Sequence, residues 1–349
     1  MDTASGWVVV GIDNGGTSNN ATVLDGSGRF LVDGLVETPS HVTEGPEVAV
    51  DAMASALDNV LELTGIPLAA VRAVGLDTPG PASADGVISS KGATNFAQPA
   101  WRGFDVRGAL EARLGLPVAY NNDANAAALY AHHVRFGDAA AGHSSISVIV
   151  GTGLGGGVVE SGRVVKGAAG MAGELGHVQI PLRGLLAEGQ PAPVCNCGFV
   201  GDAESIASLT GIVKNLLPYW LTRFENHELS RVADTKEAAK LVRAYGERDD
   251  PLARRIFEQQ AMAIGRLFTI AANYSDPDTY FLGGGVVHTA PKFRQWFLAT
   301  VREHTALRSE QQRVATLALV PDLDMAGARG AAIAAMDALQ APVRARTSL

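Results

Sequence analysis

The 349-residue sequence contains two cysteines, Cys195 and Cys197, and they stand one residue apart. Two cysteines this close cannot form an ordinary disulfide without straining the residue between them. A metal site, a reactive thiol or coincidence are the alternatives that remain. Such sparse use of cysteine fits a reducing compartment, so we expect a cytoplasmic protein.

The sequence also lacks clustered positive charge and long apolar runs. Its 28 basic residues are scattered among 36 acidic ones, and the net charge is −8. This balance argues against nucleic acid or an anionic membrane surface as the main partner. No run approaches the roughly 18 apolar residues of a membrane-spanning helix, and no basic segment followed by an apolar one opens the chain. We therefore expect no nucleic-acid or membrane partner. The length of the chain separately predicts two lobes, each with its own core.

Two segments of the chain share one order of strands and turns. Residues 8–34 read as strand, glycine loop, strand, Ser-Gly turn and strand, with "RFLVDG" as the third strand, and residues 144–167 repeat this order. Between them, apolar residues at helical spacing predict a helix around residues 50–61, and "VRAVGLD" predicts the next strand. A unit repeated this far apart indicates a duplicated α/β domain.

Each glycine loop is predicted to join two strands. Rossmann and P-loop turns instead join a strand to a helix whose N-terminus holds the phosphate, so "GTGLGG" does not indicate a dehydrogenase. Glycine-rich hairpin tips can cradle phosphate with their backbone amides, or they can be tight turns only. Asp13 and Thr17 in the first tip, together with Thr152 in the second, favour a nucleotide site.

A hydroxyl-phosphorylating enzyme also needs a base, and the segment "LPVAYNNDANAAALYAHH" supplies a candidate. A strand is predicted to end at Tyr120, and Asn121, Asn122, Asp123 and Asn125 crowd at the start of an alanine-rich helix. Ligands often bind at such a point in open α/β sheets. A helix cap accounts for one of these polar residues. We therefore predict that Asn122 binds a hydroxyl and that Asp123 accepts its proton.

The cysteines lie close in sequence to other groups that bind metals. Four groups that suit Zn²⁺ fall in one segment: His177, Cys195, Cys197 and Asp202. Glu174 stands three residues before His177, a spacing that brings two side chains together on a helical turn. A metal here would also fix the loop that presents Glu204. The alternative is a pair of idle thiols, with Asp202 capping the helix that follows.

Taken together, these motifs resemble the ROK group of bacterial sugar kinases and sugar-sensing repressors, which belong to the actin-like ATPase superfamily. "GIDNGGT" looks like the first phosphate motif, "NNDANAAAL" the base-bearing motif, "GTGLGGGVVESGRVVKGAAGMAGELGH" the long ROK signature and "CNCGFVGDAES" the zinc loop. "NYSDPDTYFLGGGVV" looks like the adenosine-side motif, and "DMAGARGAA" the closing helix. The likeness extends from about Val8 to about Met336.

The resemblance implies a two-lobed actin-like fold of the α/β class, a duplicated ribonuclease H-like ATPase fold with an interdomain cleft. The small lobe would comprise residues 1–122, with a C-terminal helix at 325–340 packing back on it, and the large lobe residues 123–324. Relatives are commonly dimers or tetramers, so a homodimer or homotetramer is expected.

The resemblance also implies roles for single residues. The phosphates and Mg²⁺ would face Asp13, Gly15, Gly16 and Thr17. They would be met from the other lobe by Thr152, Gly153 and Gly155, and the adenosine would lie along Gly283, Gly284 and Gly285. The hexose hydroxyls would be bound by Asn95, Asn122, Asp123, Glu174, His177 and Glu204.

The implied activity is transfer of the γ-phosphate of Mg-ATP to the primary hydroxyl of a hexose, with glucose as the first choice and Asp123 as general base. Mannose, fructose, allose, an N-acetylated sugar, and polyphosphate as donor stay open. A non-catalytic sugar-sensing regulator is the other class. ROK repressors carry a helix-turn-helix ahead of the first phosphate motif, and here only a few residues precede that strand, which favours catalysis.

Three features depart from the family pattern. Asp202 stands where the zinc loop usually has a third cysteine. The connector "QIPLRGLLAEGQPAPV" is longer than usual and is expected to reshape the entrance to the sugar site. The first phosphate motif also lacks the basic residue that often follows it. These departures affect the expected substrate and zinc more than phosphoryl transfer.

Overall fold

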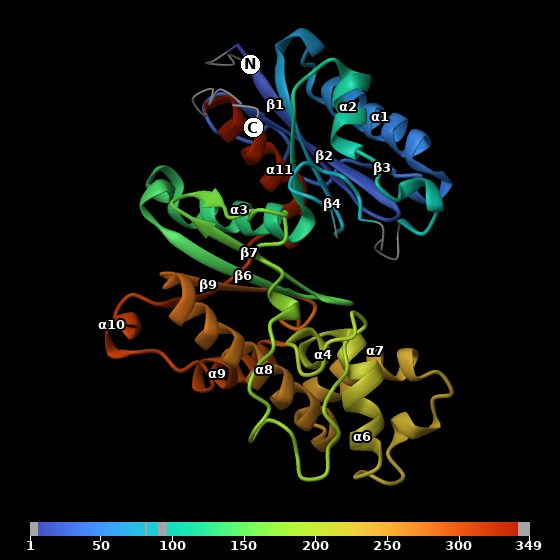
Figure 1. Ribbon diagram of the computed structural model, residues 1–349, viewed down its shortest axis with the longest axis vertical. Coiled ribbons are helices and arrows are strands. Elements are labelled where there is room, and N and C mark those ends of the chain that lie inside the picture. The colour runs from blue at the N-terminus through green and yellow to red at the C-terminus, as the bar shows by residue number, and fades with distance from the viewer. Residues whose placement is uncertain (1–5, 81, 90–95, 341–349) are drawn as a thin grey trace. The chain divides into compact units, whose positions relative to one another are not determined.

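The computed structural model describes residues 6–80, 82–89 and 96–340 (Figure 1). The chain forms two compact units. The first comprises Met1–Asp138, Arg163–Ala172 and Pro321–Leu349, and the second comprises Ala139–Gly162 and Gly173–Val320. Two five-stranded sheets covered by helices make up the fold, and the expected α/β class is confirmed.

The two sheets have the same topology. The first has the order β3-β2-β1-β4-β5, built from β1 (Val8–Asn14), β2 (Ser18–Asp25), β3 (Glu37–Pro39), β4 (Val71–Thr78) and β5 (Val118–Asn122). The second has the order β10-β9-β6-β7-β8, built from β6 (Ser144–Val150), β7 (Leu154–Glu160), β8 (Arg163–Val164), β9 (Thr279–Gly284) and β10 (Thr316–Leu319). In each sheet the first strand pairs antiparallel with the second and parallel with the fourth. The predicted duplication is confirmed.

Helices cover both faces of the first sheet. They are α1 (Pro46–Thr64), α2 (Val106–Leu114), α3 (Asp123–Phe136) and α11 (Leu323–Gln340). Val8, Val10 and Ile12 alternate along β1 and pack with the apolar side chains of α1 in one core. The intervening residues face α11, and a Cβ on Gly11 would lie 2.0 Å from the carbonyl oxygen of Ala328. Glycine therefore lets α11 lie directly on the strands (Figure 1).

The second unit contains the remaining helices. They are α4 (Glu204–Ala207), α5 (Leu209–Gly211), a π-helical turn (Ile212–Leu216), α6 (Leu217–Leu221), α7 (Thr235–Glu247), α8 (Pro251–Ser275), α9 (Pro291–Glu303) and α10 (Ser309–Gln312). Short 3-10 turns in the chain are Val42–Glu44, Leu68–Ala70, Pro99–Trp101, Gly137–Gly142, Leu175–His177 and Glu228–Arg231. Phe257 and Phe268 of α8 belong to the same apolar core as Phe293 and Phe297 of α9. Figure 1 shows the course of these two helices.

The third strand of the first sheet is not where the sequence predicted it. Residues 29–34 were expected to form this strand, but only an isolated bridge joins Phe30 to Leu24, and β3 lies at Glu37–Pro39. The Asp25 carboxylate accepts hydrogen bonds from the backbone N–H groups of Ser27 and Arg29. These bonds hold a tight turn after β2, and regular pairing resumes only at β3.

The division of lobes expected after Asn122 stays a prediction. The first compact unit of the structure extends to Asp138. Helix α3 belongs to this unit through close packing against α11. A Cβ on Gly330 would lie 1.8 Å from the carbonyl oxygen of Ala126, so the two helix backbones touch at this glycine.

In the part of the chain that the structure describes, no helix combines the length and the apolar character needed to cross a membrane.

Candidate functional site

Acidic side chains gather at the carboxyl ends of parallel strands in the first sheet. Asp13 of β1 and Asp77 of β4 are direct partners in the parallel register. Asn121 of β5 is the next partner of Asp77, and Asp123 follows it two residues later. Strand alternation turns Asp13 and Asp77 toward α11, where a Cβ on Gly327 would lie 2.6 Å from the Asp13 Oδ2 atom. The sheet and α11 thus form an acidic edge, defined by Asp13, Asp77 and Asp123.

Asp77 is fully buried, and its carboxyl group interacts with that of Asp13, while among the described residues no other group donates a hydrogen bond to either of its oxygens. Burial, followed by the charges of Asp13 and Asp123, raises the pKa of Asp77 well above its ordinary value. Burial also raises the pKa of Asp13. Two neighbouring carboxyl groups with little solvent around them repel each other when both are ionised. A proton or a cation between them removes this repulsion. Oxygen ligands of this kind suit Mg²⁺.

Our sequence reasoning missed Asp77. The available signal was an acidic residue at the end of "VRAVGLD", a strand that is otherwise almost wholly apolar. A charged residue that ends a buried strand is rare unless it has a partner or a ligand.

Asn122 and Asp123 stand at the start of α3. The Asn122 side chain is the helix cap and accepts a hydrogen bond from the backbone N–H of Asn125 at 2.7 Å. The exposed Asp123 carboxylate accepts the N–H of Ala124 at 2.7 Å. Their predicted roles in binding a hydroxyl and accepting its proton stay predictions. Asn95, also predicted to bind the sugar, lies outside the described residues.

Both glycine loops are tips of antiparallel hairpins. Gly15, Gly16 and Thr17 join β1 to β2, and Gly151–Gly153 join β6 to β7. Neither tip leads into a helix, so the prediction against a dinucleotide-binding turn is confirmed. In the first tip, the Gly15 N–H donates to the Ser18 carbonyl at 2.9 Å.

In the second unit, the β6–β7 tip and Gly283–Gly285 lie at the same edge of the sheet. Val150, just before the tip, is the parallel partner of Gly284. Gly284 has a φ of 93°, and a Cβ there would lie 2.0 Å from the Val150 carbonyl oxygen. The Gly285 N–H donates to the same carbonyl at 3.1 Å. Residues predicted to face the phosphates and the adenosine are therefore neighbours in this unit.

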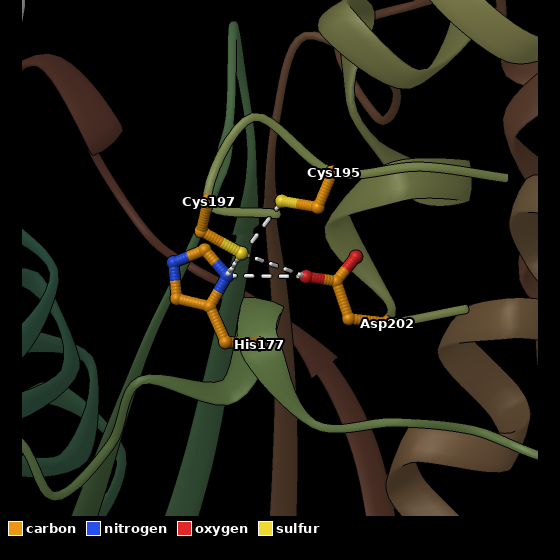
Figure 2. Close-up of side chains that lie close together, drawn as sticks. All are labelled: His177, Cys195, Cys197 and Asp202. Atoms are coloured by element: carbon orange, nitrogen blue, oxygen red, sulfur yellow. Dashed lines mark hydrogen bonds and ion pairs between the residues drawn. The ribbon is translucent and has the colours of Figure 1, made fainter. Parts of the chain in front are cut away.

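The predicted metal ligands converge in the second unit, where Figure 2 shows four side chains pointing toward one centre: His177, Cys195, Cys197 and Asp202. One ligand atom from each lies within 4.8 Å of the others. His177 Nδ1 is 3.5 Å from Cys197 Sγ, 3.8 Å from Cys195 Sγ and 3.2 Å from Asp202 Oδ2. Cys197 Sγ is 3.6 Å from the same Asp202 oxygen.

These distances fit a tetrahedral zinc site. Bonds of about 2.3 Å to sulfur and about 2.0–2.1 Å to nitrogen and oxygen, spread tetrahedrally, place the ligand atoms about 3.3–3.8 Å apart. The four distances given above lie between 3.2 and 3.8 Å, close to this range, and all the ligand atoms lie within 4.8 Å of one another. A mixed set of two thiolates, one imidazole and one carboxylate also suits Zn²⁺ chemically.

The two carboxylate oxygens of Asp202 are placed so that both of the roles that the sequence left as alternatives are compatible with each other. Its Oδ2 points to the metal ligands, while its Oδ1 accepts the N–H of Ser205 at 2.9 Å at the start of α4. The residue is fully buried, so the second bond fixes the carboxylate. Burial also raises the pKa of the Cys195 thiol well above its ordinary value.

Glu204 connects the metal ligands to the second glycine tip. Its Oε2 accepts the Leu154 N–H at 2.9 Å, and its Oε1 lies 3.4 Å from Cys195 Sγ. A Cβ on Gly153 would lie 2.7 Å from Glu204 Oε2. Burial raises the pKa of Glu174; the charge of His177 opposes this shift and that of Glu204 adds to it. Three of the predicted sugar-binding residues thus share one charged environment.

The connector between His177 and Cys195 is anchored on helices α6 and α8. The Gln259 side chain of α8 donates to the Leu185 carbonyl at 3.0 Å. The Tyr219 hydroxyl of α6 donates to the Glu188 carbonyl at 3.1 Å. The connector is therefore held by side chains of the helical layer. Its expected effect on the sugar entrance stays a prediction.

Comparison with known proteins identifies the family. The ROK family profile matches residues 9–338. A glucokinase of Halalkalibacterium halodurans is 33% identical over 79% of this chain and 80% of its own length. The ROK hexokinase of Thermus thermophilus superposes with a TM-score of 0.74 at 34% identity, covering 95% of this chain and 99% of that chain.

A ROK family glucokinase of Streptomyces griseus, in complex with glucose and AMPPNP, has a TM-score of 0.66 at 29% identity and covers 95% of this chain and 99% of that chain. The family match spans nearly all of both sheets and every motif described above. The chain belongs to the ROK family.

Proposed function

We propose that this protein is an ATP-dependent hexose kinase that phosphorylates the primary hydroxyl of its sugar, with glucose as the preferred substrate. The observation that carries the proposal is the acidic edge, because phosphoryl transfer needs carboxylates for a cation and a base for the attacking hydroxyl. The similarity to glucokinases over most of the chain supports glucose, and the glucose and AMPPNP complex of the Streptomyces griseus enzyme supports ATP as donor.

In this proposal Asp123 is the general base. The sugar oxygen attacks the γ-phosphorus in line while its proton passes to the Asp123 carboxylate. The new oxygen–phosphorus bond forms as the bond to the bridging oxygen of ADP breaks. Asp123 suits this role because it stands in the first turn of α3 with a solvent-exposed carboxylate. The N–H of Ala124 donates to one carboxylate oxygen and thereby orients the group.

The acidic edge also fits Mg²⁺ carried by the nucleotide. Asp13 would hold it, and Asp77, the strand partner of Asp13, supplies a second, fully buried carboxyl group next to it. When bound, Mg²⁺ would neutralise charge on the phosphates. Each glycine tip would provide backbone N–H groups for phosphate: Gly16 in the first tip, where Gly15 instead closes the turn through its bond to Ser18, and Thr152 and Gly153 in the second. Gly283–Gly285 would lie along the adenosine.

The second unit is proposed to hold a structural Zn²⁺ through His177, Cys195, Cys197 and Asp202. The convergence of the four ligand atoms, all within 4.8 Å of one another, supports this assignment. The site would fix the loop that leads into α4 and therefore the position of Glu204. Glu174, His177 and Glu204 are proposed to bind sugar hydroxyls, together with Asn95 and Asn122.

A coupled assay of ADP release across a panel of sugars tests the proposed activity. We expect glucose to give the highest kcat/KM, with mannose, fructose, allose and N-acetylglucosamine lower. A different preferred hexose would correct the substrate, and activity with polyphosphate alone would correct the donor. Tight sugar binding without ADP release for any member of the panel would contradict the kinase proposal and favour a sugar-sensing regulator.

Two further measurements test the remaining proposals. Elemental analysis of protein purified without added zinc should give about one Zn²⁺ per chain, because all four ligands come from one chain. Zinc-free protein that cannot take up the metal would contradict the assignment.

Light scattering should give a homodimer or homotetramer, in keeping with the assembly expected of a cytoplasmic ROK protein.

A further inference from the structure

The metal loop, defined as residues 193–203, is a narrow hairpin with few apolar anchors. Val194 and Val200 form an isolated bridge, and Cys195 N–H donates to the Phe199 carbonyl at 2.8 Å. Three apolar side chains between the ends of the loop face solvent, with Val194 49%, Phe199 53% and Val200 47% exposed, whereas Pro193 and Ala203 at its ends are buried. Apolar packing of these side chains therefore does not hold the loop in place.

The two arms of the metal loop are held in different ways. The outgoing arm, which carries Asp202, is hydrogen-bonded to the backbone of the segment just after His177. The Ile180 N–H donates to the Gly201 carbonyl, and the Ala203 N–H donates to the Val178 carbonyl, both at 3.0 Å. The incoming arm, which carries Cys195, is held by side chains of the π-helical turn: Lys214 donates to the Asn196 Oδ1 atom, and Asn215 binds the backbone of Val194. Asn215 Oδ1 accepts the Val194 N–H at 3.2 Å, and Asn215 Nδ2 donates to the Val194 carbonyl at 3.2 Å.

Asn215 therefore pairs with Val194 as a neighbouring strand would, through one donor and one acceptor. Its Nδ2 also donates to the Ser205 carbonyl of α4 at 2.8 Å. Asn215 lies in the π-helical turn Ile212–Leu216, a rare conformation that often occurs at functional sites. One carboxamide thus joins the residue before Cys195 to the helix that follows Asp202.

We propose that Asn215 is a positioning residue for the metal loop: it holds Cys195 in place for metal binding before the metal arrives. The inference rests on the proposed zinc site. A loop that is already in place loses less conformational freedom when it binds, so its affinity for the ligand is higher. Partners outside the ligand shell commonly change metal affinity by about 10–100-fold when they are removed.

The test is a titration of metal-free protein with Co²⁺ under reducing conditions. Tetrahedral Co²⁺ bound to thiolates gives strong visible absorption, and competition with Zn²⁺ then gives both affinities. We expect Asn215→Ala to bind both metals about 10–100-fold more weakly than the parent chain. Asn215→Asp keeps the acceptor for the Val194 N–H but loses both donated bonds, so its affinity should fall between the two.

Asn273→Ala is the matched control. It makes the same chemical change in α8 of the same unit, where Asn273 is exposed and donates only to Thr269 within its own helix. Its metal affinity should equal that of the parent. An Asn215→Ala variant that binds Co²⁺ as tightly as this control would overturn the inference.

Amide hydrogen exchange in metal-free protein provides an independent readout. The Val194 amide should be protected in the parent and lose that protection in Asn215→Ala, while amides of the second sheet stay protected in both. Equal exchange at Val194 in parent and variant would overturn the inference even if the variant bound metal poorly. If the parent binds no metal but its Val194 amide is protected as expected, only the zinc proposal is contradicted. This is because the protection of Val194 by Asn215 is measured in metal-free protein.

Discussion

The two sheets share a topology but differ in chemistry at the carboxyl ends of their strands. In the first sheet the register pairs Asp13 of β1 with Asp77 of β4. At the corresponding place in the second sheet, Ile149 of β6 pairs with Gly283 of β9. One copy of the repeated scaffold therefore presents carboxylates, and the other presents bare backbone. Carboxylates suit a cation and a proton acceptor, whereas glycine lets backbone N–H groups approach a ligand closely.

The two units also differ in what supports their strand ends. In the first, a single helix, α11, lies on the strands through glycine contacts. In the second, the β6–β7 tip is held by the segment after the metal loop. The Leu209 N–H donates to the Gly151 carbonyl and the Thr210 N–H donates to the Thr152 carbonyl, both at 3.0 Å. Substitutions should therefore have different consequences in the two units.

The largest effect is expected from Asp123→Asn, which removes the base from the acidic edge. The amide cannot accept the hydroxyl proton, so kcat should fall by about 10²–10⁴-fold. Sugar affinity, measured by calorimetry, should stay near that of the parent. Asp138→Asn, an exposed acid just beyond α3, is the control and should keep full activity. Turnover by Asp123→Asn at near the parent rate would show that Asp123 is not the group that accepts the hydroxyl proton.

The next largest effect is expected on the free energy of unfolding, from a substitution where α11 lies on the first sheet. A Cβ on Gly75 would lie 1.8 Å from the Ala331 carbonyl oxygen of α11, and backbone cannot move aside cheaply. Gly75→Ala should therefore lower the free energy of unfolding by about 3 kcal/mol, at the upper end of typical overpacking costs. Gly34→Ala, where a Cβ meets nothing within 4 Å, should change it by less than about 0.5 kcal/mol. Equal denaturation midpoints for the two variants would contradict the close contact with α11.

A smaller effect is expected at the glycine tip of the second sheet. Gly153→Ala would place a Cβ 2.7 Å from Glu204 Oε2, the flexible end of a side chain that can shift. The KM for ATP should rise about tenfold, which corresponds to about 1.4 kcal/mol. Gly151→Ala, in the same tip but with nothing within 4 Å of its Cβ, should leave KM almost unchanged. If both variants behaved alike, the tip would not need glycine for close approach.

The smallest effect is a change in pH dependence at Asp77. Because burial raises the pKa of this group in the folded protein, the folded state holds the proton more tightly than the unfolded chain. The associated stability is present below the unfolded pKa of about 3.9 and is lost as pH rises through the folded pKa. Asn carries no such proton. The stability of Asp77→Asn relative to the parent should therefore increase, in urea unfolding, as pH rises above about 3.9. A difference that stays constant or decreases with pH would contradict the burial of an ionisable Asp77.

Local patterns made much of the fold predictable. The expected helix around residues 50–61 lies within α1, and the expected strands at 71–77 and 144–150 are β4 and β6. Strand–glycine–strand order identified both hairpins because turn and strand signals act over a few residues. The third strand was misplaced because the Asp25 turn is stabilised by side-chain hydrogen bonds that periodicity does not reveal.

The candidate site was predictable where its residues are close in sequence. Cys195, Cys197 and Asp202 fall within eight residues, and their chemistry predicted a metal site as one of two alternatives. Asp77 was missed because its partner Asp13 is 64 residues away and meets it only through parallel strand pairing. Asn215 is hidden for the same reason, since its role depends on a contact with Val194 across 21 residues.

The sequence by itself determined the repeated strand order, the glycine hairpins, the metal-binding residue types and the family, because these are properties of short segments and their spacing. Only the tertiary structure decided which carboxylates meet, which oxygen of Asp202 faces the metal ligands and which side chain holds the metal loop. Such contacts depend on strand register and helix packing, which are set by the free energy of the whole folded chain and not by any one segment of it.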